Sequence, residues 1–381
     1  MKRPSFRNAC IAGMRLLLQG KYTLSFDQID FPIDKLSLRK RLNLAIQGLQ
    51  LMMRTVKRIG VPPILQLEPA NICNLSCLTC ATGSGLMKRA PAMMPFELYQ
   101  KIIDQVKDYV CLLVFWSWGE PFLNKDAFRM IRYAKAQGLL VHTSTNGHFF
   151  DTKEKAAEVV GSGLDSLIFA VDGLDQKTYE KYRRHGDLGR VLKSIENVVA
   201  ARSLAKLNHP VIVLRFIVMK HNEHQVPQVK DFAESLGVDI VTFRSAVVHR
   251  GEIDVEKDIA PDSVEYRQYN YEGSPSKKNR VTKKNSYCHR PYANLTVFSN
   301  GEVVHCENDF NATMQFGNLK DSDLHKIISS SEDGSFLRMF RRNLDLIPFC
   351  RDCEMRGLKR RTANVKSFVL GEKSEKYETN H

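Results

Sequence analysis

Residues 73–80 read Cys-Asn-Leu-Ser-Cys-Leu-Thr-Cys and directly follow a predicted strand over Ile64–Glu68. Three thiolates at this spacing, from Cys73, Cys77 and Cys80, can each bind one iron of a [4Fe–4S] cube and leave the fourth iron without a protein ligand. An open iron can bind a small molecule, whereas a structural zinc site is closed by four protein ligands. The pattern therefore predicts an open iron–sulfur site. The alternative is a three-cysteine zinc site completed by a distant histidine.

Short β-rich runs alternate with helical stretches across the middle of the chain. This alternation predicts a parallel sheet, and six strand–helix units are typical of a barrel or partial barrel. The expected strands are Ile64–Glu68, Leu112–Trp116, Leu139–Ser144, Ser166–Val171, Val211–Val218 and Ile240–Phe243. We therefore expect an α/β fold with the three cysteines on the loop after the first strand. In a parallel barrel, that end carries the catalytic residues.

The three-cysteine loop and the motifs after the next three strands resemble the radical S-adenosylmethionine superfamily, whose members share a (β/α)6 partial TIM barrel. The motifs are Trp118-Gly119-Glu120-Pro121, Ser144-Thr145-Asn146-Gly147 and Val171-Asp172-Gly173. The resemblance implies that Trp118, Gly119 and Glu120 bind the amino group of S-adenosylmethionine. It also implies that Ser144, Asn146 and Asp172 face the cofactor or the substrate.

Two positions depart from the pattern of that superfamily, and each short motif also has an ordinary structural explanation. Trp118 stands where the family carries a glycine, and Thr79 stands where many members place an aromatic residue. An acid such as Glu120 is favoured at a helix N-terminus by the helix dipole, and Asn-Gly and Asp-Gly are common turn formers.

A second set of cysteines lies near the C-terminus and consists of Cys288, Cys306, Cys350 and Cys353. A hairpin is predicted between the first two, with strands over Asn294–Ser299 and Glu302–Cys306 and a type I′ turn at Asn300-Gly301. The arrangement resembles the SPASM domain in its shortened "twitch" form, which implies an auxiliary [4Fe–4S] cluster held by all four thiolates. A zinc ribbon closed by the same four thiolates is the alternative.

The resemblance implies a reaction type. A reduced cluster at the first cysteine set cleaves S-adenosylmethionine and yields a 5′-deoxyadenosyl radical, which takes a hydrogen from the substrate. We expect the auxiliary cluster to accept an electron, so that a peptide or small metabolite is oxidised or cross-linked. The expected electron donor is a reductant such as flavodoxin or ferredoxin.

The net charge of +14 is concentrated in two segments. Residues 1–60 carry +9 and residues 273–290 carry +6, which leaves −1 for the rest of the chain. This concentration favours an anionic substrate or surface as a partner, and solvated basic helix faces are the alternative.

In Lys35–Ile59, apolar residues recur in steps of three and four, which predicts an amphipathic helix. We expect its apolar side to pack across the open side of the barrel; the alternative places it on an anionic membrane, with a lipid or lipid-linked sugar as substrate.

A different class of function, a metal-binding protein that contacts nucleic acid, is compatible with the basic segments, although the basic residues around Lys277–Lys284 lack interleaved aromatic residues.

Nine cysteines, seven of them in two sets, favour metal ligation in a reducing compartment. Cys10 has no evident role, and Cys111 is expected in the core. The sequence has no apolar run of transmembrane length. We therefore expect a cytoplasmic protein, with peripheral membrane association as a further possibility.

These observations divide the chain into five parts. The order is a basic helical segment (residues 1–61), the barrel (62–248), a polar linker or lid (249–287), the auxiliary cluster domain (288–356) and a C-terminal tail (357–381).

Overall fold

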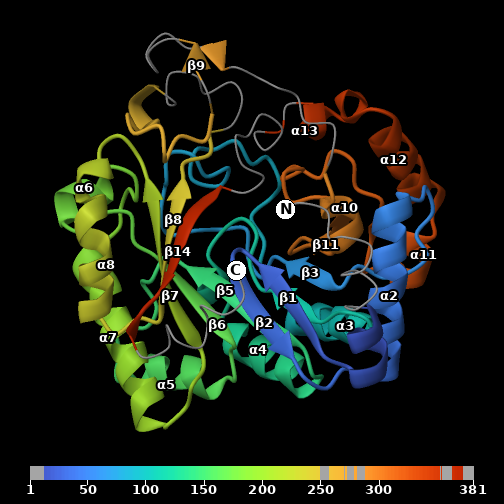
Figure 1. Cartoon of the computed structure of the whole chain (residues 1–381), viewed down its shortest axis with the longest axis horizontal. Helices are drawn as coiled ribbons and strands as arrows, with labels where there is room; N and C mark the ends of the chain where they lie inside the picture. The colour runs from blue at the N-terminus through green and yellow to red at the C-terminus, as the bar shows by residue number, and fades with distance from the viewer. Residues whose placement is uncertain are drawn as a thin grey trace.

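A computed structural model describes residues 13–248, 257–269, 271–272, 279–280, 288–351, 353 and 363–371 of the chain. Its centre is a ten-stranded sheet in the order β13-β12-β11-β3-β4-β5-β6-β7-β8-β14 (Figure 1). The six middle strands are β3 (Ile64–Leu67), β4 (Leu112–Val114), β5 (Leu140–Thr145), β6 (Ser166–Ala170), β7 (Val211–Val218) and β8 (Ile240–Ser245). All six run parallel, as a partial barrel requires.

The six strands expected from the sequence are confirmed, and β7 has the predicted bounds. The other strands begin or end one or two residues away from the prediction, which is the usual uncertainty at strand ends. Several of these strands are buried on both faces and are therefore largely apolar, as in β6 and β7.

Helices cover the outer face of the middle strands. They are α3 (Phe96–Val106), α4 (Ala127–Ala136), α5 (Lys153–Gly161), α6 (Gln176–Glu180), α7 (Leu188–Leu204) and α8 (Val226–Ser235), with short 3-10 turns η2 (Pro121–Leu123) and η3 (Glu223–Gln225). Side-chain oxygens of Thr152 and Asp187 cap α5 and α7 by accepting hydrogen bonds from main-chain nitrogens. In α3 the fully buried Tyr99, Ile102 and Ile103 pack against the sheet, which anchors the helix.

The N-terminal segment contains a hairpin that the sequence analysis missed. Strands β1 (Tyr22–Phe26) and β2 (Ile29–Ile33) pair antiparallel and follow a π-helical turn, η1 (Arg15–Gln19). Leu24, Ile29 and Phe31 pack on inward-facing residues of the middle strands. The hairpin therefore fills the inside of the barrel, and Figure 1 shows it in front of the middle strands. Its turn was not recognised because Asp27 and Gln28, which have positive φ, are not a common hairpin pair.

Helix α2 (Leu38–Met53) confirms the predicted helix in a shorter form, but the expected packing of its apolar side is wrong. The polar side chains of Lys40, Asn43 and Gln50 face the protein, and the apolar residues that suggested a buried stripe are largely exposed. No helix in the described stretches combines the length and hydropathy needed to cross a bilayer.

The C-terminal region extends the sheet instead of forming a sheet of its own. Strand β11 (Asn294–Val297) runs parallel to β3, followed by β12 (Glu302–Val304) and β13 (Gly317–Asn318). Its helical elements are α10 (Arg290–Ala293), α11 (Leu324–Ile328), α12 (Ser331–Arg342), η5 (Leu344–Leu346) and α13 (Pro348–Arg351).

The predicted hairpin at β11 and β12 is confirmed, but the predicted type I′ turn is wrong. Only Gly301 has a positive φ, and its main-chain nitrogen donates to the oxygen of Phe298. The main-chain nitrogen of Phe298 in turn donates to Glu302. This is a three-residue loop with a glycine bulge, a common alternative to the two-residue turn.

The C-terminal tail set apart from residue 357 onward includes one strand among its described residues. Strand β14 (Asn364–Val369) pairs antiparallel with β8 and closes that edge of the sheet. A lone edge strand gives a weak signal because only one of its sides pairs with the sheet.

Several parts of the chain lie outside the described residues. They are residues 1–12, with Cys10, most of the 249–287 linker, and most of the basic 273–290 segment. The described part of the linker includes β9 (Tyr271–Glu272) paired with β10 (Asn279–Arg280), and Ile259 and Tyr266 are buried.

Candidate active site

The three cysteines of the 73–80 loop line one cavity of about 170 Å³ at the carboxyl ends of the barrel strands. Cys77 is buried, and Cys73 and Cys80 are partly exposed toward the cavity. Leu75, Tyr182 and Met219 pack around them, so the loop is held in an apolar setting. The predicted juxtaposition of these thiols is therefore present in the structure.

Gly119 and Glu120 lie on the loop after β4 and contact the start of the cysteine loop. Gly119 has φ of +103°, and a Cβ atom there would lie 2.4 Å from the main-chain oxygen of Ala70. The main-chain nitrogen of Glu120 donates to Ile72 at 2.8 Å. Only glycine permits this close approach, so its presence here has a structural cause as well as the implied cofactor role.

The Glu120 carboxylate is buried and joins two strand ends. It accepts hydrogen bonds from the Thr145 hydroxyl at 2.9 Å, the Asn146 main-chain nitrogen at 2.7 Å and the Phe122 main-chain nitrogen at 3.2 Å. Burial raises its pKa to about 7. The carboxylate also lines the cavity, so it can present negative charge to a bound amino group.

Ser144 and Asn146, at the end of β5, also line the cavity. The Asn146 side chain donates to the side-chain oxygen of Asn74 at 2.7 Å and lies 3.7 Å from the Cys73 sulfur. Asn74, which the sequence analysis did not single out, thereby ties the cysteine loop to β5.

Asp172 takes a different position from the one expected, because it is fully buried and is absent from the cavity wall. Its carboxylate accepts from Arg183 Nε at 2.6 Å and from the Ile217 main-chain nitrogen at 2.7 Å. Arg183 lines the cavity, and its Nη1 lies 3.6 Å from the Cys77 sulfur. Asp172 therefore positions Arg183, which faces the cavity and which no sequence motif had indicated.

The cavity wall contains further groups that sequence reasoning missed. Tyr182 supplies an aromatic ring beside Thr79, whose hydroxyl lies 3.0 Å from the tyrosine oxygen. Arg215 and Arg244 line another part of the wall, and both contact Asp27 at the tip of the β1–β2 hairpin. These two arginines stand on β7 and β8, within strands that are mostly apolar, so the sequence did not mark them as site residues.

The second cysteine set also comes together. Cys288 and Cys350 pack against Tyr292 and the α12 aromatic residues, and Cys353 and Cys288 lie close enough to Cys306 to contribute to its raised pKa. The Asn308 side chain donates to the Cys353 sulfur at 3.3 Å.

Glu307 connects the two cysteine sets. It follows Cys306, its carboxylate pairs with Arg290 and accepts from the Gln66 side chain on β3, and its main-chain oxygen accepts from Trp118 Nε1 at 2.9 Å. Burial would raise the Glu307 pKa, but the Arg290 charge holds that pKa below its ordinary value. Trp118 therefore links the loop of the first site to the second.

The donor sets fit iron–sulfur clusters. Burial raises the pKa of Cys73 to about 12 and raises that of Cys306. A bound cationic metal would offset this effect by stabilising the thiolates. Within the described ranges no three His, Cys, Asp or Glu side chains are placed to hold one metal ion. A cube binds each thiolate to a separate iron, so its ligands need not converge on a point.

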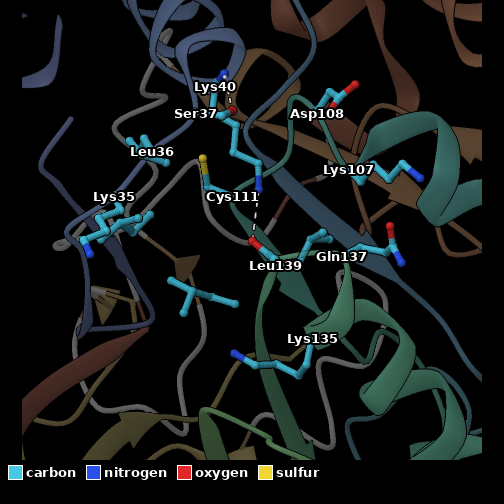
Figure 2. A pocket seen from close by; sticks show the side chains of 13 residues that line it. Lys35, Leu36, Ser37, Lys40, Lys107, Asp108, Cys111, Lys135, Gln137 and Leu139 are labelled. Carbon is cyan, nitrogen blue, oxygen red and sulfur yellow. Dashed lines mark hydrogen bonds between the residues drawn. The ribbon is translucent and has the colours of Figure 1, made fainter.

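A second cavity, of about 410 Å³, lies at the opposite ends of β4 and β5 (Figure 2). Lys35, Lys40, Lys107 and Lys135 line it, together with Cys111. Cys111 is 2% exposed, as the core prediction requires, and burial raises its pKa to about 11. Lys40 reaches across the cavity to the main-chain oxygen of Gly138 at 3.0 Å.

Comparisons with known proteins agree with this site. The profile of the radical SAM superfamily matches residues 67–233, and that of the SPASM iron–sulfur cluster-binding domain matches residues 288–354. A tungsten-containing aldehyde ferredoxin oxidoreductase cofactor-modifying protein from Pyrococcus furiosus is 25% identical over 77% of this chain and 87% of its own length. Mycofactocin maturase MftC from Mycolicibacterium smegmatis is 27% identical over 61% of this chain and 56% of its own length.

Among solved structures, SuiB of Streptococcus suis bound to S-adenosylmethionine has a similar fold, with a TM-score of 0.58 and 16% identity over 82% of this chain and 76% of SuiB. The matched ranges include all seven cysteines of the two sets, which favours iron–sulfur clusters over the zinc alternatives in both. The chain thus belongs to the radical SAM superfamily and is an enzyme of its SPASM-containing group, with S-adenosylmethionine and iron–sulfur clusters as cofactors.

Proposed function

We propose that this enzyme takes a hydrogen atom from an anionic substrate and passes an electron from the substrate radical to the auxiliary cluster. The substrate then leaves oxidised or cross-linked. When bound, a reduced [4Fe–4S] cluster and S-adenosylmethionine supply a 5′-deoxyadenosyl radical, which can attack an unactivated C–H bond. Cys73, Cys77 and Cys80 would hold the first cluster, and Cys288, Cys306, Cys350 and Cys353 the auxiliary one.

The observation that carries this proposal is the connection through Glu307. Its carboxylate contacts Gln66 of the barrel and Arg290 beside Cys288, and its main chain contacts Trp118 of the first site. This polar link holds the loops of the two cysteine sets together, which supports a transfer of the electron from a substrate radical in the first cavity to the auxiliary cluster.

The residues around the first cavity have separate tasks in this proposal. The Glu120 carboxylate and Ser144 would bind the amino group and neighbouring polar atoms of S-adenosylmethionine, and Tyr182 would pack on an apolar part of it. Arg183, held by Asp172, would offset negative charge at Cys77. The buried setting around Leu75 and Met219 would exclude water from the reacting atoms.

Arg215 and Arg244 support an anionic substrate. Two guanidinium groups line the cavity, and both contact the Asp27 carboxylate. Guanidinium groups bind carboxylates and phosphates well because their donors form a planar fork.

The similar proteins favour a peptide, with a small metabolite as the second candidate. One curated relative is a PqqA peptide cyclase, and SuiB has been solved with the precursor peptide SuiA. Flavodoxin or ferredoxin would supply the electron that reduces the first cluster.

Iron and sulfide content after anaerobic reconstitution tests the proposal. We expect about eight irons in the wild type and about four after Cys73, Cys77 and Cys80 are all changed to Ala, because each cube holds four irons. Cys111→Ala is a matched control that should keep about eight, since this thiol belongs to neither set. About four irons in the wild type and none in the triple variant would remove the electron acceptor and reject the proposal.

A second step separates the two sites. With dithionite as reductant, the double variant Cys350→Ala/Cys353→Ala should still form 5′-deoxyadenosine, whereas the triple variant of the first set should form none. Equal loss in both variants would contradict the separate role assigned to the auxiliary cluster.

A further inference from the structure

The surface of α2 carries an apolar stripe that no described residue covers. Of the sixteen large hydrophobic side chains exposed in the described part of the chain, ten lie between Met14 and Ile59. On α2 they recur at helical spacing, and Leu38, Leu49 and Met52 are 66%, 51% and 68% exposed. Contiguous exposed apolar surface of this kind marks an interaction site.

The apolar stripe cannot become buried by a simple rotation of the helix. On the opposite side of α2, Asn43 donates to the main-chain oxygen of Val61 at 2.8 Å and accepts from its nitrogen at 3.0 Å. Gln50 accepts from the main-chain nitrogen of Ile59 at 3.1 Å, and Lys40 reaches Gly138. The polar side of α2 therefore fastens the connection into β3, and the apolar side has to face outward.

The π-helical turn η1 enlarges the stripe. Arg41 of α2 donates to the main-chain oxygen of Leu17 at 3.1 Å, which places η1 beside the first turns of the helix. Met14, Leu17 and Leu18 are exposed there. Figure 1 shows α2 along the outer side of the molecule, away from the middle strands of the barrel.

Exposed basic side chains precede and follow α2 in the chain. They include Arg15, Lys35 and Lys57. Lys35 also lines the cavity beside the start of α2, together with Lys107, Lys135 and Asp108 (Figure 2). An exposed apolar helix face with basic residues along it has the character of helices that lie in the interface of an anionic bilayer.

We propose that the α2 and η1 surface docks this enzyme onto a membrane that contains anionic lipids. The apolar stripe would enter the boundary between headgroups and acyl chains, and the flanking lysines and arginines would contact lipid phosphates. A second copy of the chain fits this surface less well, because a two-fold contact would bring equal positive charges together.

The test is co-sedimentation of the full-length reconstituted enzyme with vesicles of phosphatidylcholine alone, or of phosphatidylcholine and phosphatidylglycerol in equal parts. The wild type should bind the anionic vesicles and not the neutral ones, and added salt should weaken the binding. Leu49→Gln/Met52→Gln should lower vesicle affinity about tenfold or more, because two side chains that would enter the bilayer become polar. Lys35→Gln/Lys57→Gln should also weaken it.

The matched control is Leu204→Gln/Leu207→Gln at the end of α7, which changes two exposed leucines elsewhere and should keep wild-type affinity. Unchanged iron content and thermal midpoint show that each variant folds. The proposal is overturned if the wild type stays in the supernatant with anionic vesicles, or if the α2 double variant binds them as tightly as the wild type. It is also overturned if light scattering finds a wild-type dimer that the α2 double variant dissociates, since the stripe then joins two copies.

Discussion

Trp118 Nε1 lies 2.9 Å from the main-chain oxygen of Glu307 and donates a hydrogen bond to it. The tryptophan precedes Gly119 and Glu120 of the first site, and the glutamate follows Cys306 of the second set. The Trp118 ring also packs edge-on against Phe310, with ring centroids 5.5 Å apart. Trp118 stands where the superfamily carries a glycine. Its side chain therefore joins the loops that carry the two cysteine sets.

The first prediction tests this hydrogen bond. Trp118→Phe keeps an aromatic ring but removes the N–H donor, which leaves the Glu307 oxygen without this partner. We expect a loss of about 1 kcal/mol in the free energy of unfolding, measured by urea denaturation, with both clusters retained. Trp118→Gly, which also removes the ring, should cost more. Equal stability of all three proteins would show that the link contributes nothing.

The barrel and the first site could be read from the sequence because their signals are local. The six strands were short β-rich runs separated by helical periodicity, and Cys73, Cys77 and Cys80 lay within eight residues of one another. The positions of Gly119, Glu120 and Asn146 followed from their places at strand ends.

The remaining features depend on packing between distant segments. Helix α2 has the periodicity of a core helix, yet its polar side faces inward because Asn43 and Gln50 bind the main chain near β3. Arg183 and Glu307 acquire their roles only when β6, β7 and the second cysteine set are brought together. The β1–β2 hairpin packs on barrel strands, and β14 pairs with β8, through contacts that no local pattern specifies.

The second prediction concerns Arg290, which pairs with Glu307 beside Cys288 and Cys306. Reduction adds negative charge to a cluster, so removal of a nearby positive charge should lower the reduction potential. For Arg290→Gln we expect the auxiliary potential to fall by about 40 mV, equivalent to roughly 1 kcal/mol for one electron near a partly exposed charge. Redox titration followed by electron paramagnetic resonance measures it. A rise in that potential, or a change confined to the first cluster, would contradict the assignment.

The third prediction concerns Asp27 at the tip of the inner hairpin, whose carboxylate pairs with the buried Arg215. Asp27→Asn leaves the guanidinium without its counter-charge, and we expect a loss of about 3–5 kcal/mol in the free energy of unfolding. Arg215→Gln in the Asp27→Asn background should restore part of that loss, because no unpaired charge is then left. Denaturation of both single variants and the double variant gives the coupling. Strictly additive losses would mean that the two side chains do not interact.

The last prediction concerns pH. His142 is fully buried among Phe26, Phe31 and Trp116, and burial lowers its pKa to about 3. Its ordinary value is 6.5, so between about pH 6.5 and pH 3 the unfolded chain binds a proton that the folded protein does not. His142 therefore lowers stability progressively as the pH falls through this range, and its effect vanishes above it.

His142→Phe keeps an aromatic ring in the same place and cannot be protonated. The wild type loses stability between pH 8 and pH 5 through His142, and the variant does not. The free energy of unfolding of the variant minus that of the wild type should therefore be up to about 2 kcal/mol larger at pH 5 than at pH 8, as follows from the proton linkage of a single group. His185→Phe is a control at a histidine outside the barrel interior. If the difference between His142→Phe and the wild type is the same at both pH values, the folded protein binds the proton at His142 as readily as the unfolded chain does, and the inner hairpin does not shield this side chain from solvent.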